Sequence, residues 1–183
     1  YHIQIFHTVI MKKIFFFILL FLTTFSIFLQ GTFHLRELQK TLGSGTEDSA
    51  KASLLIELGW EFRNTQPDSS IFYTRQGILL SEKINDIKKI AKAKGNLGKL
   101  YYNKSDDASA LKYYNESLAL YVELKDTPAL SSVHLNIGYS YNRTNRVSNM
   151  LSEFIKALDL AEKAGNKDKI STALYALSDY YIS

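Results

Sequence analysis

The sequence has no cysteine, only two prolines and a single tryptophan among its 183 residues. Without cysteine the chain can form neither disulfides nor thiolate metal sites, and it cannot carry a lipid on a thiol. The shortage of proline, together with 46% hydrophobic and 22% charged residues, describes a folding chain rather than a disordered one.

An excess of one charge sign is also nearly absent. The formal net charge is +4, and two of the positive residues, Lys12 and Lys13, belong to an apolar N-terminal segment. Beyond Gln30 the balance is only about +2, because residues 1–30 contain no Asp or Glu. An excess this small and scattered does not describe a nucleic-acid-binding surface.

The residues that build metal centres are sparse as well. The four histidines are His2, His7, His34 and His134. No two of them have the helical spacing of a metal-binding pair, so we interpret His134 as an ordinary helix residue. The Gly-x-Gly of residues 42–48 has no preceding strand and no Lys-Ser or Lys-Thr after it, which indicates a flexible joint.

Paired carboxylates occur at Asp106 and Asp107, where we interpret them as the acidic start of a helix, complementing its dipole. Trp60 suits either a ligand platform or a packing residue. We therefore expect no enzymatic activity, no metal and no cofactor in this chain.

The N-terminus has two parts that we exclude from the fold. Residues 1–10 precede Met11 and are interpreted as read-through from upstream of the start. Residues 11–30 combine a basic pair, an apolar run and a polar exit, the layout of a signal peptide. A retained signal anchor is the alternative, because the bulky Leu29 stands at the exit. Either way we expect an exported chain, periplasmic or anchored in the inner membrane and facing the periplasm.

A short sequence motif occurs twice at a distance of forty residues, as "NLGKLYYN" at 96–103 and as "NIGYSYNR" at 136–143. Followed outward, the pattern of an aliphatic residue, a small residue and, three later, an aromatic residue occurs four times. Its members are Leu58, Gly59 and Phe62; Leu97, Gly98 and Tyr101; Ile137, Gly138 and Tyr141; Leu177, Ser178 and Tyr181.

The second half of each unit repeats at helical spacing too. An aromatic position is followed three residues later by a small one, as in Tyr114 with Ser117 and Phe154 with Ala157, and Ala110 precedes this pair in the second unit. The first unit has Thr74 and Gly77 instead. Between units, Asp86, Asp126 and Asn166 are predicted helix N-caps.

These patterns predict helix-turn-helix hairpins that must stack to bury their apolar faces. A short helix and linker should occupy 31–46. The array should span 47–183, with units at about 47–85, 86–125 and 126–165 and an incomplete one at 166–183. The predicted fold class is all-α, a right-handed α-solenoid of about three and a half hairpins.

The repeated residues resemble the tetratricopeptide repeat family, in a long-period bacterial variant. Residues 54–86 are similar to the first repeat of exported repeat regions that precede a histidine kinase or a DNA-binding regulator module. The resemblance implies a protein-binding scaffold, the extracytoplasmic sensory or interaction region of a signalling protein, and we expect the chain to be part of something longer. A structural adaptor in an envelope or secretion assembly is the alternative.

The resemblance also implies a concave groove lined by the first helix of each hairpin. Its predicted residues are Glu57, Trp60 and Asn64; Lys92, Asn96, Lys99 and Asn103; Ser132, Asn136, Tyr139 and Arg143. Asparagines can hold a peptide backbone, and we expect Lys99 and Arg143 to attract a carboxylate without being needed for folding. The arrangement resembles, without matching, a two-carboxylate clamp. A solvated polar face is the alternative.

Overall fold

The computed structural model describes Lys40 and residues 49–182, with side chains up to Tyr180. The predictions for residues 1–10, for the signal segment at 11–30 and for nearly all of the linker at 31–46 lie outside the described residues. The chain divides between Gly45 and Thr46 into two units, and the helices described below belong to the second unit.

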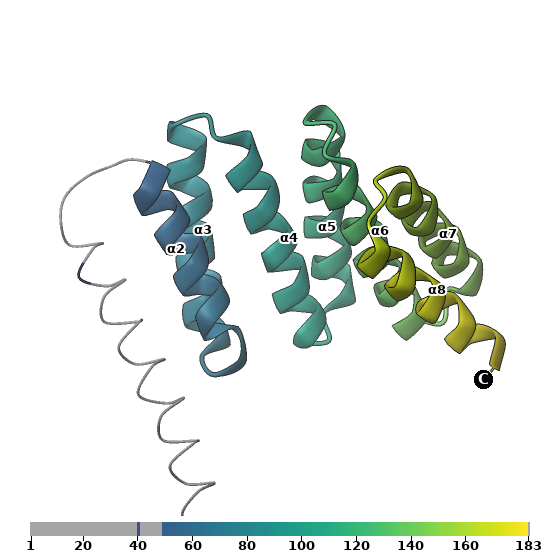
Figure 1. Cartoon of the computed structure of the whole chain (residues 1–183). Coiled ribbons are helices and arrows are strands. Elements are labelled where there is room, and N and C mark those ends of the chain that lie inside the picture. Colours follow the sequence, from purple (N-terminus) through teal and green to yellow (C-terminus); the bar gives the residue numbers. More distant parts are fainter. Residues whose placement is uncertain (1–39, 41–48, 183) are drawn as a thin grey trace, which may run out of the picture. The chain divides into compact units, whose positions relative to one another are not determined.

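The described residues of this second unit form α-helices and one short 3-10 helix, with no strand. The elements are α2 (Ser49–Glu61), η1 (Phe62–Asn64), α3 (Pro67–Lys83), α4 (Ile87–Asn103), α5 (Asp107–Glu123), α6 (Thr127–Arg143), α7 (Val147–Lys163) and α8 (Lys167–Ile182). Three antiparallel hairpins, α2–α3, α4–α5 and α6–α7, follow one another and α8 begins a fourth (Figure 1). The predicted all-α solenoid of stacked hairpins is confirmed.

The turns between helices follow a twenty-residue rhythm. From the turn after α3 onward, one residue in each turn has a positive φ, between 53° and 63°, and these residues are Asn85, Ser105, Lys125, Asn145 and Gly165. From α3 onward, a helix of seventeen residues and a three-residue turn together fill each interval, as far as the start of α8. Two such intervals make the forty-residue period that the sequence repeats.

Each of these turns ends one helix and starts the next. At the first, the Asn85 and Asp86 amides donate to the carbonyls of Glu82 and Ser81, which caps the end of α3. The Asp86 carboxylate then accepts from the Lys89 amide at 3.1 Å and caps α4. The side chains of Asp126 and Asn166 cap α6 and α8 in the same way, so the three predicted caps are confirmed. Asp106 adds a further cap within the second hairpin, at the start of α5.

The first hairpin is one residue shorter than the others, which explains the single period of 39. Its first helix ends in the tighter 3-10 turn Phe62–Asn64 before α3 begins at Pro67. A 3-10 turn advances farther per residue than an α-helix, so fewer residues reach the same point.

Within each hairpin the small residue of the first helix faces a side chain of the second. A Cβ atom at Gly138 would lie 2.5 Å from Phe154 Cδ1, and one at Gly98 would lie 2.5 Å from Tyr114 Cε1. Both rings are fully buried. In the first hairpin Gly59 faces the smaller Thr74 in the same way. Larger residues at these positions would push the two helices apart.

The other repeat-defining residues lie in the same core. Leu58, Phe62, Leu97, Ala110, Ile137 and Ala157 are buried. Tyr101, Tyr141 and Leu177 are half-buried, and the side chain of Tyr181 lies outside the described residues. In each hairpin a buried serine hydroxyl also donates a hydrogen bond to a backbone carbonyl of the other helix. The pairs are Ser70 with Gly59, Ser117 with Ala91 and Ser131 with Ala157. Each of these hydroxyls has its partner, so its burial costs little.

The stack is tighter along its first helices than along its second helices. Helix α2 contacts α4, α4 contacts α6 and α6 contacts α8, whereas among the described second helices α3, α5 and α7 any contact between neighbouring hairpins is marginal. The first helices therefore line the inner side of the array.

Replacing Gly138 by Leu should destabilise the third hairpin. Because the added side chain must displace the buried ring of Phe154, we expect the free energy of unfolding to fall by roughly 1–3 kcal/mol in urea denaturation followed by circular dichroism. Gly95→Ala is the control, since a Cβ there would meet no ring or backbone atom of the facing helix, only Ser117 Oγ at 3.2 Å and Ser117 Cβ at 4.0 Å. Equal stability of the Gly138→Leu protein and the parent would show that the small position is not needed.

Candidate functional site

Two hollows that share residues run along the inner face formed by the first helices. One, of about 410 Å³, lies between α2 and α4, and the other, of about 440 Å³, is bordered by α4, α5, α6 and α8 with Trp60 at its edge. Trp60, Lys92 and Asn96 line both hollows. The two hollows therefore adjoin each other along the inner face, and we call them together the groove.

Helical spacing places the α4 and α6 side chains in the groove. Lys92, Asn96 and Lys99 are four and three residues apart and lie on one face of α4. Ser132 and Asn136 stand forty residues after Lys92 and Asn96 and line the groove from α6. The forty-residue period therefore presents equivalent positions of neighbouring hairpins side by side.

The part of the groove between α4 and α8 is cationic. The charged residues that line it are Lys92, Lys99 and Lys169, without a carboxylate among them. Lys169 reaches back from α8, and its ammonium donates to the Pro128 carbonyl at 2.7 Å and contacts the Ser132 hydroxyl. Burial lowers the pKa of Lys169, an effect that the charge of nearby Asp126 opposes.

The part between α2 and α4 has mixed charge. Glu57 and Glu61 line it together with Lys89 and Lys92. The ammonium of Lys89 is already paired with Asp86. Charge therefore changes along the groove, from a stretch that contains carboxylates at α2 to a purely cationic stretch towards α8.

Trp60 lies where the two parts of the groove meet. The ammonium nitrogen of Lys99 lies 5.4 Å from the centroid of the indole ring, and the Arg63 guanidinium carbon lies 4.3 Å from it. Arg63 also donates to the Trp60 carbonyl at 2.8 Å. These cation–π contacts hold the indole against the groove wall.

The fold has relatives among solved structures, although no protein-family model and no curated protein matches the chain. BtubC from P. vanneervenii has a TM-score of 0.64 and 18% identity, covering 80% of this chain and 65% of its own. The apo form of RapI has a TM-score of 0.68 and 16% identity, covering 80% and 42%. Aspartyl phosphate phosphatase F from Bacillus subtilis has a TM-score of 0.73 and 16% identity, covering 83% and 41%.

These neighbours are helical-repeat proteins of the tetratricopeptide-like type, so the chain has a tetratricopeptide-like fold. At such low identity the likeness shows the fold alone. The chain spans less than two thirds of the length of each neighbour.

The predicted groove residues separate into two groups. Lys92, Asn96, Lys99 and Asn136 line the groove together with Trp60, Glu57 and Ser132. Asn64, Asn103, Tyr139 and Arg143 do not line either hollow. Asn103 is exposed at the end of α4, and Asn64 is exposed in the turn after α2.

Tyr139 packs into the third hairpin instead. Its ring lies 5.2 Å from that of Phe154, edge to face. Burial raises the pKa of the Tyr139 phenol, and the neighbouring Tyr102, Asp179 and Tyr175 raise it further. The phenol is therefore neutral at physiological pH.

Lys169 is a groove residue that the sequence alone did not single out. It occupies the position of Lys89 two units later. Both lysines reach back to the first two turns of the preceding first helix, Lys169 to Ser132 and Lys89 to Ser49. That eighty-residue correspondence was the available signal. This correspondence is weak in the sequence because residues 166–183 match only the first half of a unit.

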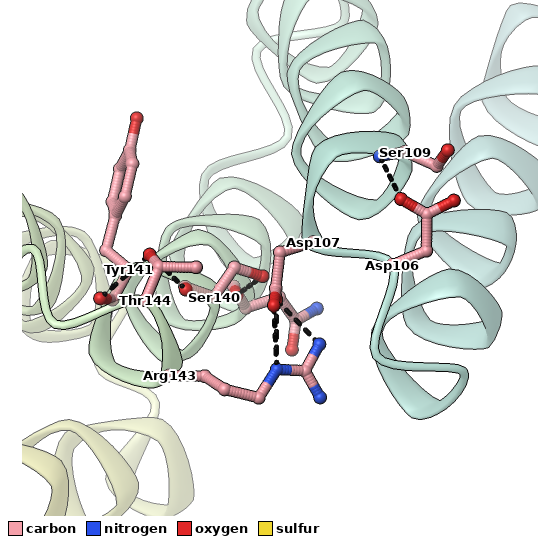
Figure 2. Close-up of polar contacts among 8 residues, drawn as sticks. Asp106, Asp107, Ser109, Ser140, Tyr141, Arg143 and Thr144 are labelled. Atoms are coloured by element: carbon pink, nitrogen blue, oxygen red, sulfur yellow. Dashed lines mark hydrogen bonds and ion pairs between the residues drawn. The ribbon is translucent and has the colours of Figure 1, made fainter.

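Arg143 is held between two hairpins and does not face the groove. Its guanidinium donates to both carboxylate oxygens of Asp107, at 2.6 to 3.0 Å (Figure 2). The guanidinium carbon also lies 3.7 Å above the Tyr102 ring. The hydrogen bond to Asp107 raises the pKa of Arg143. The sequence interpretation offered Arg143 to a partner's carboxylate from the groove, whereas in the structure its guanidinium is already paired with Asp107.

A second ion pair joins hairpins in the same way. Lys104, just after α4, pairs at 3.1 Å with Asp68 in the first turn of α3. In both cases a carboxylate at the start of the second helix of one hairpin pairs with a cation at the end of the first helix of the following hairpin. Asp107 thus does more than complement a helix dipole.

His134 pairs with a carboxylate inside the third hairpin. Its Nδ1 lies 2.6 Å from Glu153 Oε2, and Lys156 contacts the other oxygen at 2.7 Å. Burial raises the pKa of Glu153, but the hydrogen bonds from His134 and Lys156 outweigh it and leave the pKa below its usual value. The described residues contain no cluster of three metal-ligating side chains.

None of the helices in the described ranges combines the length and apolar character needed to cross a bilayer. The apolar segment at 11–30 lies outside those ranges.

Arg143→Ala should lower stability. We expect a loss of about 1 kcal/mol in urea denaturation, because a bidentate ion pair and a cation–π contact disappear together. Arg146→Ala is the control, since Arg146 lies at the edge of cation–π range from Tyr141, at 6.0 Å, and no carboxylate of the described residues pairs with it.

A double-mutant cycle with Asp107→Asn assigns the loss to the pair. Additive effects of the two substitutions would mean that the ion pair contributes nothing to stability.

Proposed function

We propose that this chain is a protein-binding scaffold whose groove holds an extended segment of a partner protein. The observation that carries the proposal is the succession of two adjoining hollows along three hairpins, with Asn96 and Asn136 at equivalent inward positions. A side-chain amide both donates and accepts, which is what a peptide backbone requires. The helical-repeat fold of the solved neighbours supports a scaffold role.

The proposal gives this chain no catalytic step. One neighbour is named as an aspartyl phosphate phosphatase, and at 16% identity that activity is not carried over. Ser132 and Lys169 touch in the groove, but Lys169 also donates to the Pro128 carbonyl. We interpret its ammonium as a tie between α8 and α6 rather than as a general base.

We further propose that the chain is the extracytoplasmic interaction region of a signalling protein. The layout of residues 11–30, with Lys12 and Lys13 before an apolar run, supports export. The similarity of residues 54–86 to exported sensor repeats supports the signalling role. A structural adaptor remains the second candidate, and it needs no ligand in the groove.

Groove binding can be tested with peptides selected from a random library against the full chain. For a selected peptide, Asn96→Ala with Asn136→Ala should raise the dissociation constant about tenfold, since each substitution removes hydrogen bonds from a side-chain amide to the peptide backbone. Fluorescence anisotropy of the labelled peptide measures this change.

Asn115→Ala is the matched control, because Asn115 is exposed on the second helix α5 and lines neither hollow. Equal losses in the control and in the double variant would place the binding site elsewhere. A selection that yields no peptide would favour the adaptor.

Export can be tested by fusing alkaline phosphatase, which folds only outside the bacterial inner membrane, after Ser183. We expect an active fusion, and an inactive one when residues 11–30 are deleted, because the apolar segment would direct translocation. Activity that does not depend on residues 11–30 would overturn the proposed role of this segment.

A further inference from the structure

We propose that the cationic stretch of the groove selects partners by clustered Asp and Glu side chains, so that the bound segment is acidic. This inference rests on the proposed function and names the chemistry of the partner. It comes from the distribution of charge in the folded groove, where Lys169 completes a set that Lys92 and Lys99 begin.

Lys92 and Lys99 are available to a ligand. Both side chains are exposed, and among the described residues no carboxylate forms an ion pair with either. Lys99 instead lies over the ring of Trp60. Several other lysines of the array are already neutralised by carboxylates: Lys88, Lys89, Lys94, Lys104, Lys156 and Lys163.

Lys169 has a different part in this set. Its ammonium is partly buried and has two neutral oxygen partners, the Pro128 carbonyl and the Ser132 hydroxyl. Neither partner cancels its charge, while Asp126 contributes only at a distance beyond direct pairing. Lys169 therefore adds a positive charge held by two hydrogen-bond partners at the α8 side of the groove, opposite the exposed ammonium groups of α4.

The charge pattern favours an acidic protein segment over a nucleic acid. A phosphate backbone that continued along the groove would meet Glu57 and Glu61 in the stretch between α2 and α4. Peptide carboxylates can be confined to the cationic stretch, while uncharged residues of the same peptide lie beside α2. Asn96 and Asn136 also match peptide amides better than phosphates.

Trp60 gives the binding event an optical signal. It is the sole tryptophan of the chain, and the Lys99 ammonium lies over its ring. A carboxylate that attracts Lys99 would change the cation–π contact and the polarity around the indole. The emission of the full chain should therefore report on ligands in the cationic stretch.

The test compares two labelled peptides that differ only in charge, both acetylated and amidated. One has the sequence Gly-Asp-Glu-Asp-Glu-Gly, and the other replaces each acid by its amide, Asn or Gln. We expect the acidic peptide to bind the full chain about five- to twentyfold more tightly, as two or three exposed ion pairs allow, and to shift Trp60 emission. The preference should shrink as salt is added.

The variant Lys92→Gln with Lys99→Gln should remove most of this preference without changing the melting temperature, because both side chains are exposed. Lys112→Gln is the control, since Lys112 is exposed on α5 and lines neither hollow. It should keep the preference intact.

Three results would overturn the inference. If the amide peptide binds as tightly as the acidic one, the lysines do not select charge, although library peptides that depend on Asn96 and Asn136 would still support groove binding. If the amide peptide with a free C-terminus binds as tightly as the acidic peptide, the cationic stretch of the groove recognises a terminal carboxylate rather than acidic side chains. Tighter binding of oligothymidylate than of the acidic peptide would make the ligand a nucleic acid.

Discussion

The close approach of the two helices of each hairpin is the constraint on which the rest of the structure depends. Gly98 and Gly138 leave room for the buried rings of Tyr114 and Phe154, and the helices meet at the distance that these glycines permit. A narrow hairpin can then stack on the next one through its first helix. Because the first helices stack more tightly than the second, the array curves and an inner groove exists.

The turns keep successive hairpins in register, and the groove depends on that register. A turn residue with positive φ recurs every twenty residues, and the residue after it caps the next helix in four of the five turns. Since α4 and α6 have equal lengths, positions forty residues apart lie side by side. Asn96 and Asn136 thereby form a strip that no single helix could present.

Charge is distributed according to two different roles. Where hairpins meet at the ends of the first helices, Asp68 with Lys104 and Asp107 with Arg143 neutralise each other and join one repeat to the next. In the middle of the inner face, Lys92 and Lys99 have no such carboxylate partners in the described structure. The cations at the ends thus belong to the architecture, and those in the middle are the ones that a partner protein can use.

The periodic features of this protein could be predicted from the sequence because they are local. The small positions Gly59, Gly98 and Gly138, the capping residues and the inward face of α4 each follow from spacing along one chain segment. Contacts between hairpins could not, because they depend on how far a long side chain reaches across a stack. Arg143 has a groove-like position in the sequence, yet it turns to Asp107, thirty-six residues away. Lys169 enters the groove only because α8 packs beside α6, so the tertiary arrangement decides which cations remain for a ligand.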